Sequence, residues 1–240
     1  SNLSNPNGNS TYHAAQARLV EKALFYYDQA GDQARNVFQN AAAADYYARA
    51  LSLVAPGDLQ MQYQLRVKLD DVYDQLGNRE VQKRNLERLH HLAGALGKPY
   101  NFAEVSKLET NYRFSIAEFP QTIEKAKETI ELAQQAGNRE FAMRAYAYIM
   151  SSLVSLGKYG EAVGFAEAGL QLARETGHLS GEAQLLNVYG LIALKLRDPE
   201  TARNRLERSL EIYHQVGNLR GEATPLANLG MVYSYLSDYP

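Results

Sequence analysis

The stretch GKYGEAVGFAEAGLQLA, residues 157–173, decides the fold, because small apolar residues recur in it at helical spacing. It continues through RETGHLS (174–180), and similar turns, QQAGNRE (134–140) and HQVGNLR (214–220), lie 40 residues before and after it. The same interval of 40 residues separates Gly57, Gly97, Gly137, Gly177 and Gly217. A glycine followed by a polar residue is the usual left-handed end of a helix. The sequence therefore predicts repeating units that each end in a helix stop.

A second set of breaks falls midway between these glycines. It consists of Gly77-Asn78, Phe119-Pro120, Gly157-Lys158 and Arg197-Asp198-Pro199. Proline suits the first turn of a helix, where a missing N–H costs little. Each unit is thus predicted to hold two helices of about 16–18 residues joined by tight turns. Because no segment alternates with a period of two, we expect an all-α fold without strands.

The second helix of most units carries a small residue, another residue four positions on, and a small residue three further. The triplets are Ala43/Tyr47/Ala50, Thr122/Ala126/Thr129, Ala162/Ala166/Gly169 and Ala202/Leu206/Ser209, whereas Gln82, Leu86 and Leu89 depart from the pattern. Small residues let two helix axes approach closely. Since one hairpin cannot bury such a stripe alone, neighbouring hairpins are expected to stack.

These segments resemble tetratricopeptide repeats in their longer, roughly forty-residue form. The resemblance rests on residues 157–173 and on NAAAADYYARALSLVAPGD (40–58), LNVYGLIALKLRDPETARNRLERSLEIY (186–213) and LANLGMVYSYLSDYP (226–240). It covers residues 12–240 and is degenerate over 60–137. It implies a right-handed superhelical solenoid of about eleven helices. The expected organisation is a disordered or tag-derived lead-in (1–11) and a single array with units 12–57, 58–97, 98–137, 138–177, 178–217 and a half unit 218–240.

The two ends of the array carry narrower indications. EKALFYYDQAGDQARNVFQNAAAADYYARAL (21–51) has an AGD turn followed by what we expect to be an elongated second helix. That arrangement resembles the first hairpin after the ATPase module of bacterial STAND-type signalling ATPases, ATPase-coupled adenylate cyclases and MalT-like activators. After Gly217 one helix remains, and it would expose Leu226, Leu229, Met231 and Tyr233. We therefore expect a fragment of a longer array, or self-association through this last helix.

Composition and motifs exclude several classes of function. The net charge of −2 comes from 25 basic and 27 acidic residues without clusters, which does not favour nucleic-acid binding. There is no cysteine and no apolar stretch of membrane-spanning length, so we expect a cytoplasmic protein. His90 and His91 are adjacent and would point apart on a helix, so no metal site is predicted. No phosphate-binding loop or nucleophile elbow is present, so we expect no cofactor, no catalytic residue and no enzyme activity.

The resemblance implies a concave wall made by the first helix of each hairpin. The candidate binding residues on this wall are Gln64, Asp71, Asp74, Gln75, Glu104, Lys107, Asn111, Arg144, Tyr148, Ser151, Gln184, Asn187 and Lys195. Lys107 and Asn111 resemble the first pair of a clamp that holds chaperone C-termini. Tyr148, Gln184 and Val188 stand where the clamp needs Asn, Lys and Arg, so the clamp is rejected.

Three functions remain open. The first is a protein- or peptide-binding scaffold or regulatory module within a larger bacterial signalling or transcription-regulating protein, with charges on the wall setting the register of an extended peptide. The second is a receptor for a small peptide or small-molecule signal in the concave groove, where Asn side chains hold a peptide backbone. The third is a structural spacer or self-association segment.

Overall fold

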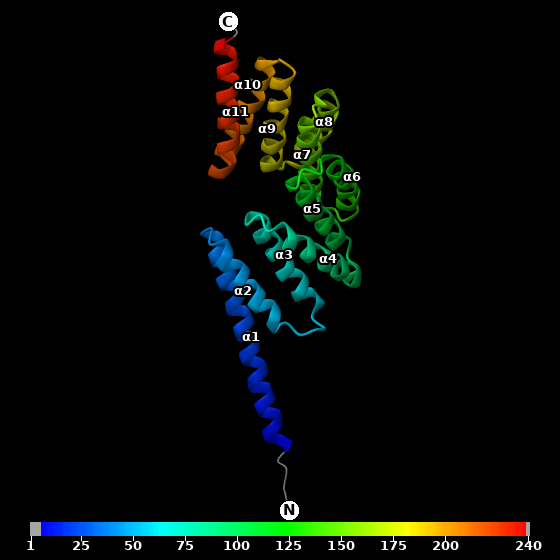
Figure 1. Cartoon of the computed structure of the whole chain (residues 1–240), viewed down its shortest axis with the longest axis vertical. Coiled ribbons are helices and arrows are strands. Elements are labelled where there is room, and N and C mark those ends of the chain that lie inside the picture. The colour runs from blue at the N-terminus through cyan, green and yellow to red at the C-terminus, as the bar shows by residue number, and fades with distance from the viewer. Residues whose placement is uncertain (1–5, 239–240) are drawn as a thin grey trace, which may run out of the picture. The chain divides into compact units, whose positions relative to one another are not determined.

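The computed structural model describes residues 6–238, with side chains over residues 16–237, and this part of the chain forms eleven α-helices and no strand (Figure 1). The helices are α1 (Pro6–Asn36), α2 (Asn40–Leu53), α3 (Leu59–Gln75), α4 (Arg79–Leu96), α5 (Pro99–Ser115), α6 (Phe119–Gln135), α7 (Arg139–Ser155), α8 (Tyr159–Thr176), α9 (Leu179–Lys195), α10 (Pro199–Gln215) and α11 (Leu219–Asp238). From α3 to α10 each helix has 17 or 18 residues. The all-α class and the number of helices are confirmed.

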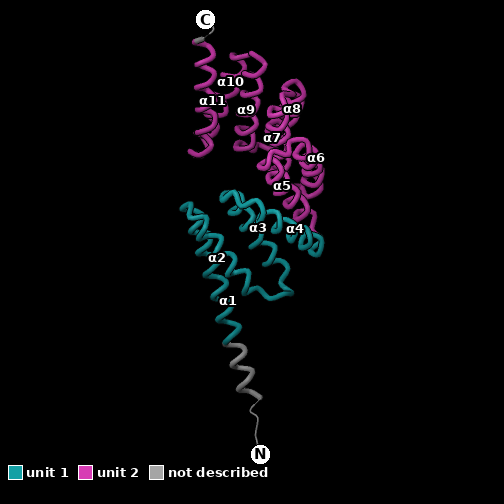
Figure 2. Tube along the Cα trace, in the orientation of Figure 1, with its two compact units in different colours: residues 1–97 teal, residues 98–240 magenta. Residues whose placement is uncertain are grey.

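The chain divides into two compact units, residues 1–97 and 98–240 (Figure 2). Within each unit, every helix packs against the next one along the chain. In unit 2 the first helices of successive hairpins also pack on one another, α5 on α7, α7 on α9 and α9 on α11. We call α5, α7, α9 and α11 the first-helix row. The single array over 12–240 and its unit boundaries stay predictions. Of the expected lead-in, residues 1–5 lie outside the described residues, and α1 begins at Pro6.

The turns follow the predicted register because they use left-handed residues at fixed intervals. Six glycines have φ between 63° and 72°: Gly77, Gly97, Gly137, Gly157, Gly177 and Gly217. Ala117 (φ 60°) and Arg197 (φ 62°) take the same conformation at the corresponding positions of their units. Each turn leads into the next helix, and Asn78, Asn138 and Asp198 cap that helix by accepting a hydrogen bond from the amide three residues on.

The expectation of a left-handed stop at Gly57 is wrong. Helix α2 already ends at Leu53, the backbone of the next residue, Val54, is extended (ψ 130°), and Gly57 does not have a positive φ. The reason is Pro56, which disfavours helical conformation in the residue before it. The chain then crosses a short loop to Asp58, whose Oδ1 accepts a hydrogen bond from Met61 N at 3.0 Å and starts α3.

The expected turn at Ala30-Gly31-Asp32 and the elongated second helix are also wrong. Helix α1 runs through this segment without a break, and it is the long member of the hairpin, with 31 residues against 14 in α2. Gly31 is needed for close packing, because a Cβ there would lie 2.4 Å from Tyr47 Cε1. The chain turns instead at Phe38, with φ 62°.

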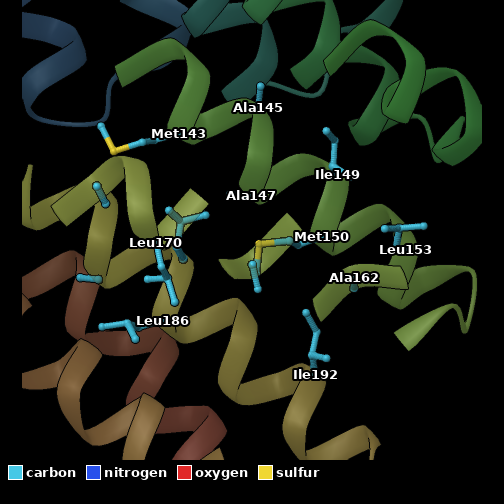
Figure 3. Close-up of a cluster of buried hydrophobic side chains, with 14 of the residues drawn as sticks. Met143, Ala145, Ala147, Ile149, Met150, Leu153, Ala162, Leu170, Leu186 and Ile192 are labelled. Atoms are coloured by element: carbon cyan, nitrogen blue, oxygen red, sulfur yellow. The ribbon is translucent and has the colours of Figure 1, made fainter. Parts of the chain in front are cut away.

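The largest core cluster of unit 2 joins α7, α8 and α9, as Figure 3 shows. Ile149 and Met150 of α7 are fully buried, and Leu186 and Ile192 of α9 belong to the same cluster. The triplet residues of the second helices are buried as expected: Ala43, Tyr47, Ala50, Thr122, Ala126, Thr129, Ala162, Ala166, Gly169, Ala202, Leu206 and Ser209. Close approach of helices through small residues therefore positions the first-helix row.

Candidate functional site

Nine of the thirteen candidate residues lie on the first-helix row of unit 2. They are Glu104, Lys107 and Asn111 on α5, Arg144, Tyr148 and Ser151 on α7, and Gln184, Asn187 and Lys195 on α9. Each of them is exposed or half-buried, so each side chain is reached by solvent. The apolar residues between them, such as Ile149 and Leu185, are fully buried. The helical period thus separates a packing face from a polar face on the same helices.

Two hydrogen bonds cross between neighbouring helices of the row. Tyr148 Oη donates to Asn111 Oδ1 at 2.6 Å, joining α7 to α5. Asn228 Nδ2 donates to Asn187 Oδ1 at 2.9 Å, joining α11 to α9. In both cases the acceptor is an asparagine carbonyl, so the amide is held in one orientation. The Nδ2 groups of Asn111 and Asn187 donate to no acceptor within the described part of the chain, and each remains available to a ligand.

Aromatic rings lie beside the first of these hydrogen bonds and beside the neighbouring lysine. The rings of Phe114 and Tyr148 lie 5.3 Å apart, and those of Tyr100 and Phe141 lie 5.4 Å apart. Lys107 Nζ stands 5.0 Å from the centroid of Phe141, which is a cation–π geometry. Burial, followed by the nearby carboxylate of Glu104, raises the pKa of Tyr100. These contacts place aromatic side chains next to the polar groups of α5 and α7.

Sequence reasoning missed three residues of this region: Phe114, Phe141 and Asn228. Sequence reasoning assigned no role to the two phenylalanines. Asn228 lies 41 residues after Asn187, which is one residue off the repeat interval, and this offset hid the pairing. Arg144, which it had selected, forms an exposed pair with Glu140 at 3.2 Å on the same helix.

The other four candidates lie on α3 in unit 1, and the two acidic ones serve the packing of that unit. Asp71 pairs with Arg35 of α1 at 3.5 Å, and Asp74 binds the guanidinium of Arg79 at the start of α4. Gln64 and Gln75 are exposed. The α3 residues are therefore a separate set from the first-helix row.

Part of the chain matches a known repeat family. Residues 181–240, which span most of α9 and all of α10 and α11, match the family model described as tetratricopeptide repeat. Residues 181–240 therefore carry tetratricopeptide repeats. Two curated relatives align to parts of it. Sister chromatid cohesion protein SCC4 of Arabidopsis thaliana is 37% identical over 120 residues, and regulatory protein AfsR of Streptomyces griseus is 28% identical over 141 residues. The alignments cover 48% and 59% of this chain but only 16% and 14% of those proteins.

Solved structures of other proteins share the fold at low sequence identity. The crystal structure of a STAND protein with a tetratricopeptide repeat sensor from Pyrococcus horikoshii superposes with a TM-score of 0.72 at 16% identity, covering 90% of this chain and 34% of that one. A Rap protein complexed with competence and sporulation factor gives a TM-score of 0.61 at 16% identity, covering 91% and 65%. At this identity the likeness establishes the fold of the repeats.

A half-buried polar network between α1, α2 and α3 was not found by sequence reasoning. Tyr47 Oη donates to Asp32 Oδ1 at 2.6 Å, and Lys68 Nζ pairs with Asp28 at 2.7 Å and with Asp32 at 3.0 Å. Burial raises the pKa of Asp32, but the hydrogen bonds from Tyr47 and Lys68 outweigh it, so this pKa is lowered. Burial and the same carboxylate raise the pKa of Tyr47 well above its usual value. This network fastens α1 to α2 and α3.

No group of His, Asp and Glu side chains within residues 16–237 has the arrangement of a metal site. His90 and His91 are both exposed on α4. Among the helices described, none combines the length and apolarity that a membrane crossing requires.

Proposed function

We propose that this chain is a protein-interaction module that holds an extended peptide segment of a partner along the first-helix row of unit 2. One observation carries the proposal: Asn111 and Asn187 are each held through Oδ1 by a neighbouring helix and retain an unused Nδ2 donor. A side-chain amide fixed in this way can donate to a peptide carbonyl without losing rotamer freedom on binding.

The surroundings of these amides suit a peptide. An extended chain presents a carbonyl about every 3.3 Å along its length, so it can reach donors on successive helices. The neighbouring rings of Phe114 and Tyr148 offer contact area for a side chain of the ligand. Glu104, Arg144 and Lys195 bring both signs of charge to the row, which sets the register of a charged peptide.

We further propose that the module works inside a larger bacterial signalling or transcription-regulating protein. The likeness to the STAND protein with its repeat sensor and the partial match to regulatory protein AfsR support this context. The same proposal assigns this segment no catalysis and no nucleic-acid partner, and it places the protein in the cytoplasm. Self-association through α11 is an additional proposal, supported by the exposure of Leu226 and Met231.

Peptide display tests the proposal directly. Peptides selected from a random library on the whole chain would be synthesised and titrated calorimetrically against matched variants. Asn111→Asp and Asn187→Asp keep the oxygen that accepts from Tyr148 or Asn228 and remove the Nδ2 donor. Each should weaken binding by about tenfold, the value of one hydrogen bond whose partner is left buried and unpaired. Gln134→Glu, the same chemical change on the exposed face of α6, serves as the control and should leave the affinity unchanged.

Two results would refute this site: selected peptides that bind all three variants equally, or peptides that respond only to Gln134→Glu. A receptor for a short signal peptide is the second candidate, favoured by the Rap complex with competence and sporulation factor. The two functions can be distinguished by inserting a selected peptide into a carrier protein and measuring whether this chain still binds it. A module for protein partners binds the embedded segment as well as the free one, whereas a receptor that reads the free ends of a signal peptide loses it.

A further inference from the structure

A cleft of about 420 Å³ opens in unit 1 where α2, α3 and α4 meet. Leu51 of α2, Leu69 and Tyr73 of α3 and Val81 of α4 supply its apolar lining. Arg66 of α3 and Arg84 and Arg88 of α4 supply positive charge. A volume of this size suits a small organic ligand, and the mixture of apolar wall and a few polar groups is typical of such sites.

The three arginines are arranged to act together. Arg84 and Arg88 stand one helical turn apart, so their side chains leave α4 on the same face. Arg66 is half-buried and is fixed by Asn85: its Nη1 donates to Asn85 Oδ1 at 3.3 Å, and Asn85 Nδ2 donates to the Arg66 carbonyl at 2.8 Å. Burial, followed by the positive charge of Arg88, lowers the pKa of Arg66. A guanidinium is thus oriented in a site that disfavours its charge.

Carboxylates do not balance these charges. Within the described side chains Arg66 and Arg88 form no ion pair, and Arg84 reaches only Glu80, at 3.9 Å on the exposed surface. The other arginines at helix contacts of this unit are paired, Arg35 with Asp71 and Arg79 with Asp74. Three like charges gathered in a cleft repel one another, and a bound anion would remove that repulsion.

We propose that this cleft binds a phosphate monoester carried on an aromatic or aliphatic body. Guanidinium forks match phosphate oxygens in pairs, and three of them fit a dianion better than the single charge of a carboxylate. Leu51, Leu69 and Val81 would cover the apolar body of the ligand, and the Tyr73 ring would pack against it. The site lies in unit 1, so it is distinct from the peptide-binding row proposed for unit 2.

Calorimetric titration of the whole chain with phenyl phosphate tests this site. We expect saturable binding below about 1 mM, with phenylacetate and inorganic phosphate each weaker by about tenfold, because one lacks the second charge and the other lacks the apolar body. Arg88→Gln, at an exposed position, and Arg66→Gln should each weaken phenyl phosphate by about tenfold. Lys83→Gln removes the same charge from an exposed position of α4 outside the cleft and should leave binding unchanged.

The outcomes decide the proposal. No saturation with phenyl phosphate up to about 10 mM overturns it. So does an equal loss in Lys83→Gln and Arg88→Gln, which would mean general attraction to a basic surface. Circular dichroism shows whether Arg66→Gln folds. If it does not, Arg88→Gln still tests the site, because Arg88 is exposed and its replacement should not disturb folding. A phosphotyrosine peptide that binds more tightly than phenyl phosphate with the same arginine dependence supports the site and names a modified protein as the source of the ligand. Equal affinities for the phosphotyrosine peptide and phenyl phosphate also support the site, and they indicate that a free small-molecule phosphate ester is the ligand.

Discussion

Replacing Gly190 by alanine should destabilise unit 2, although alanine is the better helix former. Gly190 lies inside α9, where it faces α10. A Cβ at this position would stand 2.6 Å from Leu206 Cγ, 2.9 Å from Leu206 Cδ2 and 3.2 Å from the Ala202 carbonyl oxygen. Carbon atoms in normal contact are about 3.5–4.0 Å apart, so the two helices must move apart or Leu206 must leave its rotamer.

The two opposing effects can be weighed. Alanine in place of a helical glycine gains about 1 kcal/mol through the lower entropy of the unfolded chain. Overpacking of a well-packed core costs about 1–3 kcal/mol, and the backbone oxygen of Ala202 puts this site at the upper end. The expected net loss is about 1–2 kcal/mol, or about 2–8 °C in Tm for a chain of this size.

Gly164→Ala provides the matched control. Gly164 is an exposed position within α8, and an added Cβ there would meet nothing within 4 Å. This variant should gain about 0.5–1 kcal/mol, so the two glycine replacements are expected to have opposite signs. Urea unfolding followed by circular dichroism measures both, and equal slopes of the transitions show that the free energies are comparable.

A double-mutant cycle identifies the cause of the loss. Leu206→Ala removes the side chain that the new Cβ would strike and leaves only the Ala202 oxygen close, so Gly190→Ala should cost less in that background. If Gly190→Ala is as stable as Gly164→Ala, or if its full cost persists after Leu206 is truncated, the reasoning from close approach is refuted.

Three further predictions concern turns, a helix cap and the network around Asp32. Ala117→Gly and Arg197→Gly should each raise stability by about 1 kcal/mol in urea unfolding, because both residues have positive φ; no gain would contradict a left-handed turn. Asp198→Ala should lose about 1 kcal/mol at pH 7. Because a backbone amide lowers the pKa of Asp198, this cap acts above the unfolded pKa of about 4 and is lost as pH falls through the lower folded value, whereas Asp198→Asn should keep the cap without that pH dependence. Tyr47→Phe should cost about 1 kcal/mol by removing the hydrogen bond to the half-buried carboxylate of Asp32, and an unchanged urea midpoint would contradict that role.

The sequence predicted the helices well because their ends depend on local chemistry. A left-handed glycine followed by a capping residue stops one helix and starts the next within three or four positions, so Gly137-Asn138 can be read from the chain alone. The prediction failed where a glycine is required by a contact with a distant helix and not by a turn. At Gly31 the absent side chain makes room for Tyr47, which comes from another helix, and neither periodicity nor turn chemistry reveals such a contact.

The candidate site was predictable only in part, for a related reason. The resemblance to tetratricopeptide repeats implied that Asn111 and Asn187 lie on a wall made by the first helices, and both are partly exposed on those helices. Their partners depend on how neighbouring helices are shifted along one another, and the offsets of 37 and 41 residues depart in opposite directions from the repeat. The arginine cleft was missed because Arg66 and Arg88 come from different helices, and each alone resembles an ordinary surface residue.

Polar residues that packing does not require are where function can be sought in this chain. Most polar groups at helix contacts have a partner: Ser106 Oγ lies 2.7 Å from Thr129 Oγ1, and Gln82 Nε2 donates to Asp70 Oδ2 at 3.3 Å. Against that background, two oriented amides with unused donors and an arginine cluster without carboxylates stand out. Solvent reaches both amides and the exposed Arg84 and Arg88, so water rather than the protein satisfies their unused donors and a ligand can replace that water. Both sets therefore define surfaces where substitution should change binding more than it changes stability.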